Sequence, residues 1–256
     1  MPIIRHLEQL PASARGGAVA IGNFDGVHLG HRRIVERLLQ RADEVGGPAI
    51  VFTFDPHPAM LLRPDECPPP LTWTERKAEL LKELGVDRIV AFHTDDAFLQ
   101  LSAREFFDRI VVGALAARAM VEGPNFFFGH NREGNVELLR ALTAARGITL
   151  DVVEPVSLDG QLVSSSRIRR LVAAGDVSAA ARMLTRPYRI RGMVTHGAGR
   201  GATLGFPTAN LRLDPACGLK HGIYAVRVDK GGRRYGGVAS FGRRPTFDNG
   251  APLLEI

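Results

Sequence analysis

Apolar residues recur along the first two-thirds of the chain in two alternating patterns. Short apolar runs with strand character alternate with longer stretches in which apolar residues return every three or four positions, as at Ile34, Leu38 and Ala42. The pattern predicts strands at 18–22, 48–54, 87–92, 118–122 and 148–153, and helices at 29–45, 74–84, 102–115 and 135–146. Repeated alternation of strand and helix implies right-handed crossovers and a mostly parallel, doubly wound α/β sheet of Rossmann-like type.

Local signals refine the ends of these helices. The spacings Thr72-x-x-Glu75 and Ser102-x-x-Glu105 predict capping boxes, in which each side chain bonds the other residue's backbone N–H. Gly85 and Gly147 predict helix ends, because glycine adopts the left-handed conformation that commonly follows the last turn.

The character of the chain changes after residue 184. Two short helical stretches, 165–174 and 177–184, are followed by alternation from Tyr188 to Thr195, which places Tyr188, Ile190 and Val194 on one face of a strand. Segments 222–228 and 234–240 flank the turn sequence 229–233 and predict a hairpin. We expect an α/β domain at 1–185 and a β-rich domain at 186–256.

Composition is that of an ordinary globular protein. The chain has 256 residues, of which 45% are apolar and 23% charged, enough to bury a sizeable core. No secretory signal or membrane span is predicted, and Cys67 and Cys217 form no redox or metal motif, so we expect a cytoplasmic protein without a membrane partner. The net charge of +6 comes from dispersed basic residues without interleaved aromatics, which predicts no nucleic-acid partner and fits a polyphosphate substrate.

The segment 18–31 carries the clearest chemistry. An apolar strand runs through glycine-spaced residues into an amphipathic helix, with His28 and His31 at the helix start. Backbone N–H groups lack partners there and the helix dipole favours anions, so the segment predicts a phosphate site with imidazole donors. Two histidines at this spacing could also be a surface pair or metal ligands. Zinc is disfavoured, because no residues at ligand spacing supply the remaining positions.

Residues 22–31 resemble the G-x-F-D-G-x-H-x-G-H motif of bacterial bifunctional riboflavin kinase/FAD synthetase. Three further segments resemble the same family: Phe54-Asp55-Pro56-His57-Pro58, the loop 123–129, and 164–169, where Ser166 stands for the usual threonine. Each also has a structural interpretation: prolines that end a strand, phenylalanines of a core, and a helix N-cap. Four motifs in the family's order favour the functional interpretation.

The resemblance implies adenylyl transfer in the first domain, from ATP to FMN, with FAD and pyrophosphate as products. It implies catalytic roles for His28, His31 and Arg167, the arginine holding the departing pyrophosphate. It implies Mg²⁺ bound to the triphosphate. The nucleotide- and phosphate-binding residues it implies in this domain are Gly22, Phe24, Asp25, Gly30, Asn125, Ser164, Ser165 and Ser166.

The second domain resembles riboflavin kinase, with a partial flavokinase β-barrel as the implied fold. The stretch 204–211, Leu-Gly-Phe-Pro-Thr-Ala-Asn-Leu, carries the resemblance. It implies Thr208 and Asn210 as ligands of Mg²⁺ and Glu255 as the base that takes a proton from the riboflavin 5′-hydroxyl. The glycine run at 192–201 would by itself predict only a flexible turn. Within it and after it, the resemblance implies nucleotide-binding roles for Gly197, Gly199, Arg200 and Pro207.

The sequence thus predicts a bifunctional flavin-nucleotide enzyme that uses ATP, riboflavin and FMN and is compatible with a homo-oligomer. Because the chain stops at Ile256, one residue past Glu255, we expect a truncated kinase domain with weak activity at most. One alternative is another H-x-G-H nucleotidyltransferase, acting on pantetheine phosphate or nicotinate mononucleotide. A second alternative is a non-catalytic nucleotide- or RNA-binding regulator.

Overall fold

A computed structural model describes residues 3–196, 208–213, 217–242 and 253–256. The chain divides into two compact units: the first holds residues 1–67 and 72–165, and the second holds 68–71 and 166–256. The helices at 165–184 therefore pack mainly with the second unit. The functional division expected near residue 185 stays a prediction.

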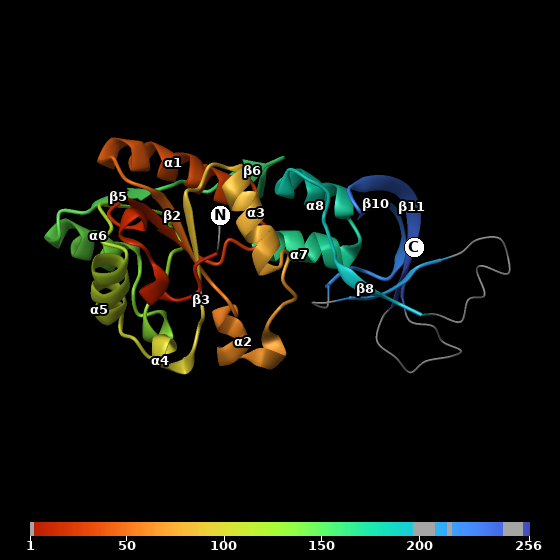
Figure 1. The fold of residues 1–256 in the computed structure, drawn as a ribbon, viewed down its shortest axis with the longest axis horizontal. Coiled ribbons are helices and arrows are strands. Elements are labelled where there is room, and N and C mark those ends of the chain that lie inside the picture. Colours follow the sequence, from red (N-terminus) through yellow and green to blue (C-terminus); the bar gives the residue numbers. More distant parts are fainter. Residues whose placement is uncertain (1–2, 197–207, 214–216, 243–252) are drawn as a thin grey trace. The chain divides into compact units, whose positions relative to one another are not determined.

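The first unit is built on a five-stranded parallel sheet in the order β3-β2-β1-β4-β5 (Figure 1). Its strands are β1 (Ala18–Ile21), β2 (Ala49–Phe54), β3 (Arg88–Phe92), β4 (Ala119–Glu122) and β5 (Thr149–Val152). All five predicted strands are confirmed, with ends that shift by one residue. The order reverses between β1 and β4, which makes the sheet doubly wound as expected.

Helices cover both faces of this sheet. One core packs α1 (Leu29–Val45) and α3 (Thr74–Glu83) on the sheet, through Leu38 and Leu81 among others. The opposite core packs the segment 103–114 and α6 (Val136–Ala145), through residues such as Phe107 and Leu139. The shorter elements are η1 (Leu7–Gln9), η2 (Ala12–Ala14), α2 (Pro58–Leu62), η3 (Pro64–Glu66), α4 (Asp96–Leu99), η5 (His130–Arg132), and the hairpin of β6 (Ser157–Leu158) and β7 (Gln161–Leu162).

The helix predicted at 102–115 is present, but only its beginning is α-helical. It consists of α5 (Ala103–Phe106) followed by η4 (Phe107–Ala114), a π-helix. The Ser102 capping box is confirmed at its start, with the Glu105 N–H donating to Ser102 Oγ and the Ser102 N–H donating to Glu105 Oε2. At its end the Leu115 N–H reaches back five residues to the Ile110 carbonyl at 2.9 Å.

The capping box predicted at Thr72 is wrong. Helix α3 begins at Thr74 with Trp73 at the N-cap and no side-chain cap. The Thr72 hydroxyl bonds Asp25 instead, so it is not available to the helix. The helix ends predicted at Gly85 and Gly147 are confirmed, since both have left-handed backbone conformations just past α3 and α6.

The second unit contains α7 (Ser165–Ala174), α8 (Val177–Leu184) and an antiparallel sheet in the order β10-β11-β12-β9-β8. Its strands are β8 (Gly192–Thr195), β9 (Asn210–Leu213), β10 (Gly222–Lys230), β11 (Arg233–Gly242) and β12 (Leu253–Glu255). The predicted hairpin is confirmed as β10 and β11, with Gly231 and Gly232 as a two-residue turn in the left-handed region.

The strand predicted at 188–195 is only half confirmed. It begins at Gly192, where pairing with β9 begins. The predicted common face is also wrong, because Ile190 packs on the cluster of Ala239, Phe241 and Leu254, whereas Val194 is 68% exposed. The run before Gly192 is not part of β8, so strand alternation does not extend across it.

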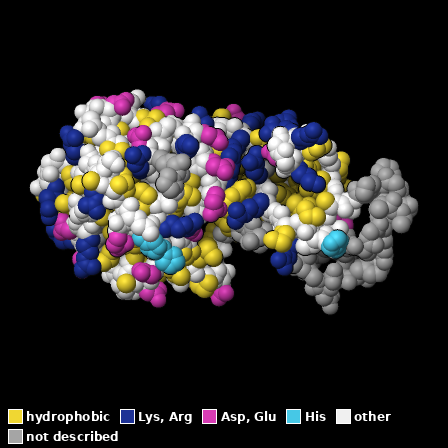
Figure 2. Space-filling view, in the orientation of Figure 1, with side chains coloured by type: hydrophobic (Ala, Val, Ile, Leu, Met, Phe, Trp, Pro, Cys, Tyr) yellow, Lys and Arg dark blue, Asp and Glu magenta, His cyan; other side chains and the backbone are white. Residues whose placement is uncertain are grey.

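The structure also bears on membrane-spanning segments and on the distribution of surface charge. Among the described residues, no helix is both long enough and apolar enough to cross a lipid bilayer. On the face of the first unit seen in Figure 2, Lys and Arg side chains are scattered among acidic ones rather than gathered into one patch.

Candidate active site

A cavity of about 640 Å³ opens at the carboxyl edge of the parallel sheet. Residues at or just beyond the ends of four strands line it: Ile21 and Gly22 at the end of β1, Phe54 and His57 at and beyond the end of β2, Glu122 and Gly123 at the end of β4, and Val153 and Glu154 after β5. The cavity is of the size that holds a small ligand, and it lies where ligands bind in open α/β sheets.

The two histidines of the first motif lie side by side at the start of α1. His28 is the N-cap residue and is 6% exposed, and its Nδ1 accepts the His31 backbone N–H at 3.4 Å. The two rings stack with centroids 3.7 Å apart, and both line the cavity. Because Nδ1 of His28 accepts, its neutral ring carries the proton on Nε2 and can donate there. Gly30 allows this packing, since a Cβ at Gly30 would lie 3.2 Å from the His28 ring.

The turn before α1 is held in an uncommon conformation. Phe24, Gly26 and Val27 all have positive φ, at 46°, 84° and 39°. Only the glycine adopts this region without steric cost, so the surroundings must hold the other two residues in place. The spacing of glycines predicts the bend at Gly26, but no sequence signal marks Phe24 or Val27.

Asp25 is not among the residues that line the cavity, although the resemblance implies a binding role for it. Its carboxylate, 5% exposed, accepts the backbone N–H of Thr72 at 2.9 Å and the Thr72 hydroxyl at 3.1 Å. The same hydroxyl accepts the Gly26 N–H at 3.1 Å. The Asp25 carbonyl accepts a hydrogen bond from Ser165 Oγ at 2.8 Å. Asp25 thus joins the turn to two distant segments.

We expect Thr72→Val to lower the free energy of unfolding by about 1–2 kcal/mol. Valine keeps the shape of the side chain, but the buried Asp25 carboxylate and the Gly26 N–H each lose a hydrogen-bond partner. Chemical denaturation of the purified variant measures the change. Thr149→Val is the matched control, since Thr149 is exposed on β5. Equal stability in both variants would show that the Asp25–Thr72 contact does not hold the turn.

A buried lysine under the same turn was missed from the sequence. Lys77 on α3 is 7% exposed, and its Nζ donates to Thr53 Oγ1 at 3.1 Å, while Thr53 Oγ1 donates to the Asn23 carbonyl at 3.1 Å. Burial lowers the pKa of Lys77, and the charges of Asp25 and Asp55 oppose that shift. The register of α3 was the available signal, because Lys77 shares a face with the core residues Ala78 and Leu81.

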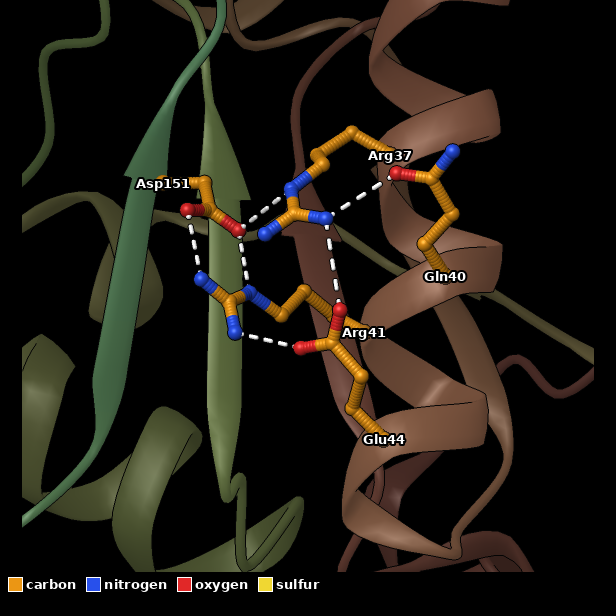
Figure 3. A network of polar contacts seen from close by, with 5 residues as sticks. All are labelled: Arg37, Gln40, Arg41, Glu44 and Asp151. Atoms are coloured by element: carbon orange, nitrogen blue, oxygen red, sulfur yellow. Dashed lines mark hydrogen bonds and ion pairs between the residues drawn. The ribbon is translucent and has the colours of Figure 1, made fainter.

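Helix α1, which carries the two histidines, is tied to the sheet by a polar network (Figure 3). Arg37 Nε bonds Asp151 Oδ2 on β5 at 2.9 Å, and Arg41 makes a two-point contact with the same carboxylate. Glu44 and Gln40 on α1 bond the outer nitrogens of these arginines. The hydrogen bond from Arg41, aided by Arg37, lowers the pKa of Asp151.

A lowered pKa in the folded state means that Asp151 stabilises the fold above its unfolded pKa, and that this stabilisation is lost as the pH falls through the folded value. We therefore expect Asp151→Asn to cost about 1–2 kcal/mol at neutral pH and less below about pH 4. Urea denaturation at both pH values tests this. Asp43→Asn, a change of an exposed residue on α1, is the control. A cost that does not vary with pH would contradict the ion-pair account.

The phenylalanines of the loop after β4 divide between the core and the cavity. Phe128 is buried in the core and Phe126 packs against that core. Phe127 is 44% exposed, lines the cavity, and lies under the Arg132 guanidinium at 4.3 Å from its ring centroid. Asn125 is exposed and also lines the cavity, and its role in nucleotide binding stays a prediction.

The third motif is divided between the units. Ser164 lines the cavity and Ser165 bonds the Asp25 carbonyl. Ser166 and Arg167 lie in the first turn of α7, among residues that group with the second unit. Their roles in the site stay predictions.

In the second unit, two predicted site residues lie opposite each other. Asn210 on β9 pairs with Glu255 on β12, and residues opposite one another on antiparallel strands place their side chains on the same face. Asn210 is 7% exposed and Glu255 is half-buried. Thr208 precedes β9 and is exposed. The predicted residues Gly197, Gly199, Arg200 and Pro207 lie outside the described residues.

Comparison with known proteins assigns both units to one family. The sequence model of FAD synthetase matches residues 10–167, and that of riboflavin kinase matches residues 184–256. A curated bifunctional riboflavin kinase/FMN adenylyltransferase from Pseudomonas fluorescens is 40% identical over all of this chain and 82% of its own length. The protein of the same name from Escherichia coli K12 is 34% identical, also over 82% of its length. The chain belongs to the bifunctional riboflavin kinase/FMN adenylyltransferase family.

Solved structures agree with this fold. A crystal structure described as a macrolide-efflux protein from Streptococcus pneumoniae superposes with a TM-score of 0.87 and 30% identity, over 99% of this chain and 83% of that one. Family membership accounts for both motif sets, including the riboflavin kinase stretch at 204–211.

Proposed function

We propose that the first unit transfers the adenylyl group of ATP to FMN. The FMN phosphate oxygen attacks the α-phosphorus, the bond from that phosphorus to the bridging oxygen of the β-phosphate breaks, and pyrophosphate leaves. The observation that carries the proposal is the pair of stacked imidazoles at the N-terminus of α1, which line a ligand-sized cavity at the sheet edge.

This arrangement supplies what the reaction needs from a protein, namely alignment and stabilisation of developing negative charge. Backbone N–H groups at the helix start and the imidazoles of His28 and His31 would bind the phosphates. Asn125 and Ser164, which line the same cavity, would position the nucleotide. Gly22 and Gly30 have no side chains and would let the nucleotide approach the turn closely, and Phe24 would contact it from the same cavity wall. We assign Arg167, Ser165 and Ser166 to the departing pyrophosphate.

We further propose that the second unit transfers the γ-phosphoryl group of ATP to the riboflavin 5′-hydroxyl. The pairing of Glu255 with Asn210 supports this, because it brings a candidate base next to a candidate metal ligand. The amide oxygen of Asn210 and the hydroxyl of Thr208 are hard oxygen donors of the kind that Mg²⁺ prefers. Bound there, Mg²⁺ would neutralise charge on the ATP phosphates.

The described residues contain no group of three or more His, Cys, Asp or Glu side chains placed to hold a metal ion. Such a cluster is not needed, because Mg²⁺ commonly uses one or two protein ligands together with waters and substrate phosphates. An enzyme that uses ATP, riboflavin and FMN needs a compartment that contains these metabolites, so we expect the protein to work in the cytoplasm.

Incubation with ATP and Mg²⁺, together with either riboflavin or FMN, tests both activities when the flavins are separated by chromatography. FAD formed from FMN supports the adenylyl transfer, and FMN formed from riboflavin supports the kinase. Adenylylation of pantetheine phosphate or nicotinate mononucleotide in place of FMN would favour a different nucleotidyltransferase. Binding of ATP without turnover of any acceptor would favour a non-catalytic regulator.

A further inference from the structure

Strands β1 and β4 are neighbours in the parallel sheet, yet their pairing ends before β1 does. Their register runs through Ala18–Ala119 and Val19–Met120. At Ile21 the backbone N–H donates instead to Oε1 of Glu122, at 2.8 Å. A carboxyl side chain therefore takes the place of a strand carbonyl where the two strands separate.

This separation lies at the point where the strand order reverses. From β1 the sheet extends to β2 and β3 on one side and to β4 and β5 on the other. The crevice that forms at such a point is the usual ligand site of an open α/β sheet. Ile21 and Glu122 both line the cavity that His28 and His31 also line.

Among the described residues, no cation pairs with the buried carboxyl of Glu122. The residue is 3% exposed, and in the same part of the chain the Ile21 N–H donates to its carboxyl oxygen. Burial raises the pKa of Glu122 well above the ordinary value, and the Ile21 N–H opposes the shift only in part. Other titratable or charged groups line the same cavity, from α1, α2 and the loops after β2, β4 and β5: His28, His31, His57, Arg63, His130, Arg132 and Glu154.

We propose that Glu122 is a positioning residue of the nucleotide site. As a neutral carboxylic acid it accepts the Ile21 N–H and keeps the crevice between β1 and β4 in shape. When it ionises, it repels the nucleotide phosphates. This inference rests on the proposed adenylyl transfer. It adds a pH dependence of its own to ATP binding, because an ionised carboxylate lining a cavity that binds phosphates places two negative charges close together. Affinity for ATP then falls as the pH rises.

The test compares ATP binding to the wild-type chain and to Glu122→Gln, from about pH 6 to about pH 9. Glutamine keeps an acceptor for the Ile21 N–H and cannot ionise. We expect wild-type affinity for MgATP to fall about tenfold more than that of the variant over this range. Both proteins carry the same histidines and are given the same ligand, so the difference isolates Glu122. Equal pH courses in the two proteins would overturn the inference.

Two further measurements keep the test decisive if Glu122→Gln folds poorly. Adenosine lacks phosphates, so its affinity for the wild-type protein should stay constant over the pH range in which that of ATP falls. Infrared spectra of the wild-type protein at neutral pH should contain the carbonyl band of a protonated carboxylic acid. The band should be weaker in Glu122→Gln. If that variant does not fold, the band of the wild-type protein should disappear as the pH rises. If the affinities for ATP and adenosine changed with pH in the same way, or if the band were absent, the inference about Glu122 would be overturned and the proposed function would not be affected. No ATP binding at any pH would overturn the proposed function as well.

Discussion

Replacing His31 with alanine should reduce FAD formation from FMN and ATP by about 10²–10³-fold while leaving the fold intact. His31 lines the cavity from the first turn of α1, is only partly buried, and contributes its backbone N–H, not its ring, to the N-cap contact with His28. Its removal therefore takes a phosphate donor from the site without opening the core. Steady-state rates at saturating ATP, together with circular dichroism, measure the two effects separately.

His93→Ala is the matched control for this variant. His93 is exposed, follows β3, and is not among the cavity-lining residues. Its loss should leave the rate unchanged. His28 makes a less informative variant, because it is buried and caps α1, so its removal would disturb the helix start as well. Wild-type turnover in His31→Ala would contradict the assignment of the first motif.

Glu255→Gln should lower phosphorylation of riboflavin by about 10²–10⁴-fold, because glutamine cannot take the proton from the 5′-hydroxyl. Glutamine preserves the size of the side chain opposite Asn210, so β12 should still pair with β9. Adenylyl transfer from ATP to FMN, which we assign to the first unit, should continue at the wild-type rate in the same variant. Parallel assays with riboflavin and with FMN measure both activities on one preparation.

Asp229→Asn provides the control in the second unit. Asp229 lies near the turn of the β10–β11 hairpin and pairs with Arg189 and Arg234 at the surface. We expect this change to leave both activities unaltered. A Glu255→Gln protein that phosphorylates riboflavin as fast as the wild type would remove Glu255 from the site.

The alternation of apolar runs was enough to predict the first sheet, because strands β1 to β4 are largely buried and the long helices each present an apolar face. Helix α1 was predicted to the residue. Thr72 shows where such reasoning fails: its spacing to Glu75 fits a cap, yet a carboxylate 47 positions away competes for its hydroxyl and wins. Local spacing carries no information about partners that distant. The strand at 188–195 fails similarly, because β9 decides where its pairing begins.

The candidate site was predictable where motifs mark it and not elsewhere. His28, His31, Asn125 and Ser164, which belong to three of the four motifs, line one cavity. Glu122 was missed, because a single acidic residue at the end of an apolar strand has no motif. Its significance comes from the separation of β1 and β4, which only the three-dimensional structure contains. Burial of Lys77 beneath the turn likewise follows from packing rather than from spacing.

A crystal structure of the protein with FMN and a non-hydrolysable ATP analogue would show where the triphosphate binds. We expect it at the N-terminus of α1, with phosphate oxygens within hydrogen-bond distance of the His28 or His31 imidazoles. We also expect the α-phosphorus to face the FMN phosphate. A triphosphate bound away from this turn, with the cavity beside β1 and β4 left to solvent, would contradict the proposed adenylyl transfer.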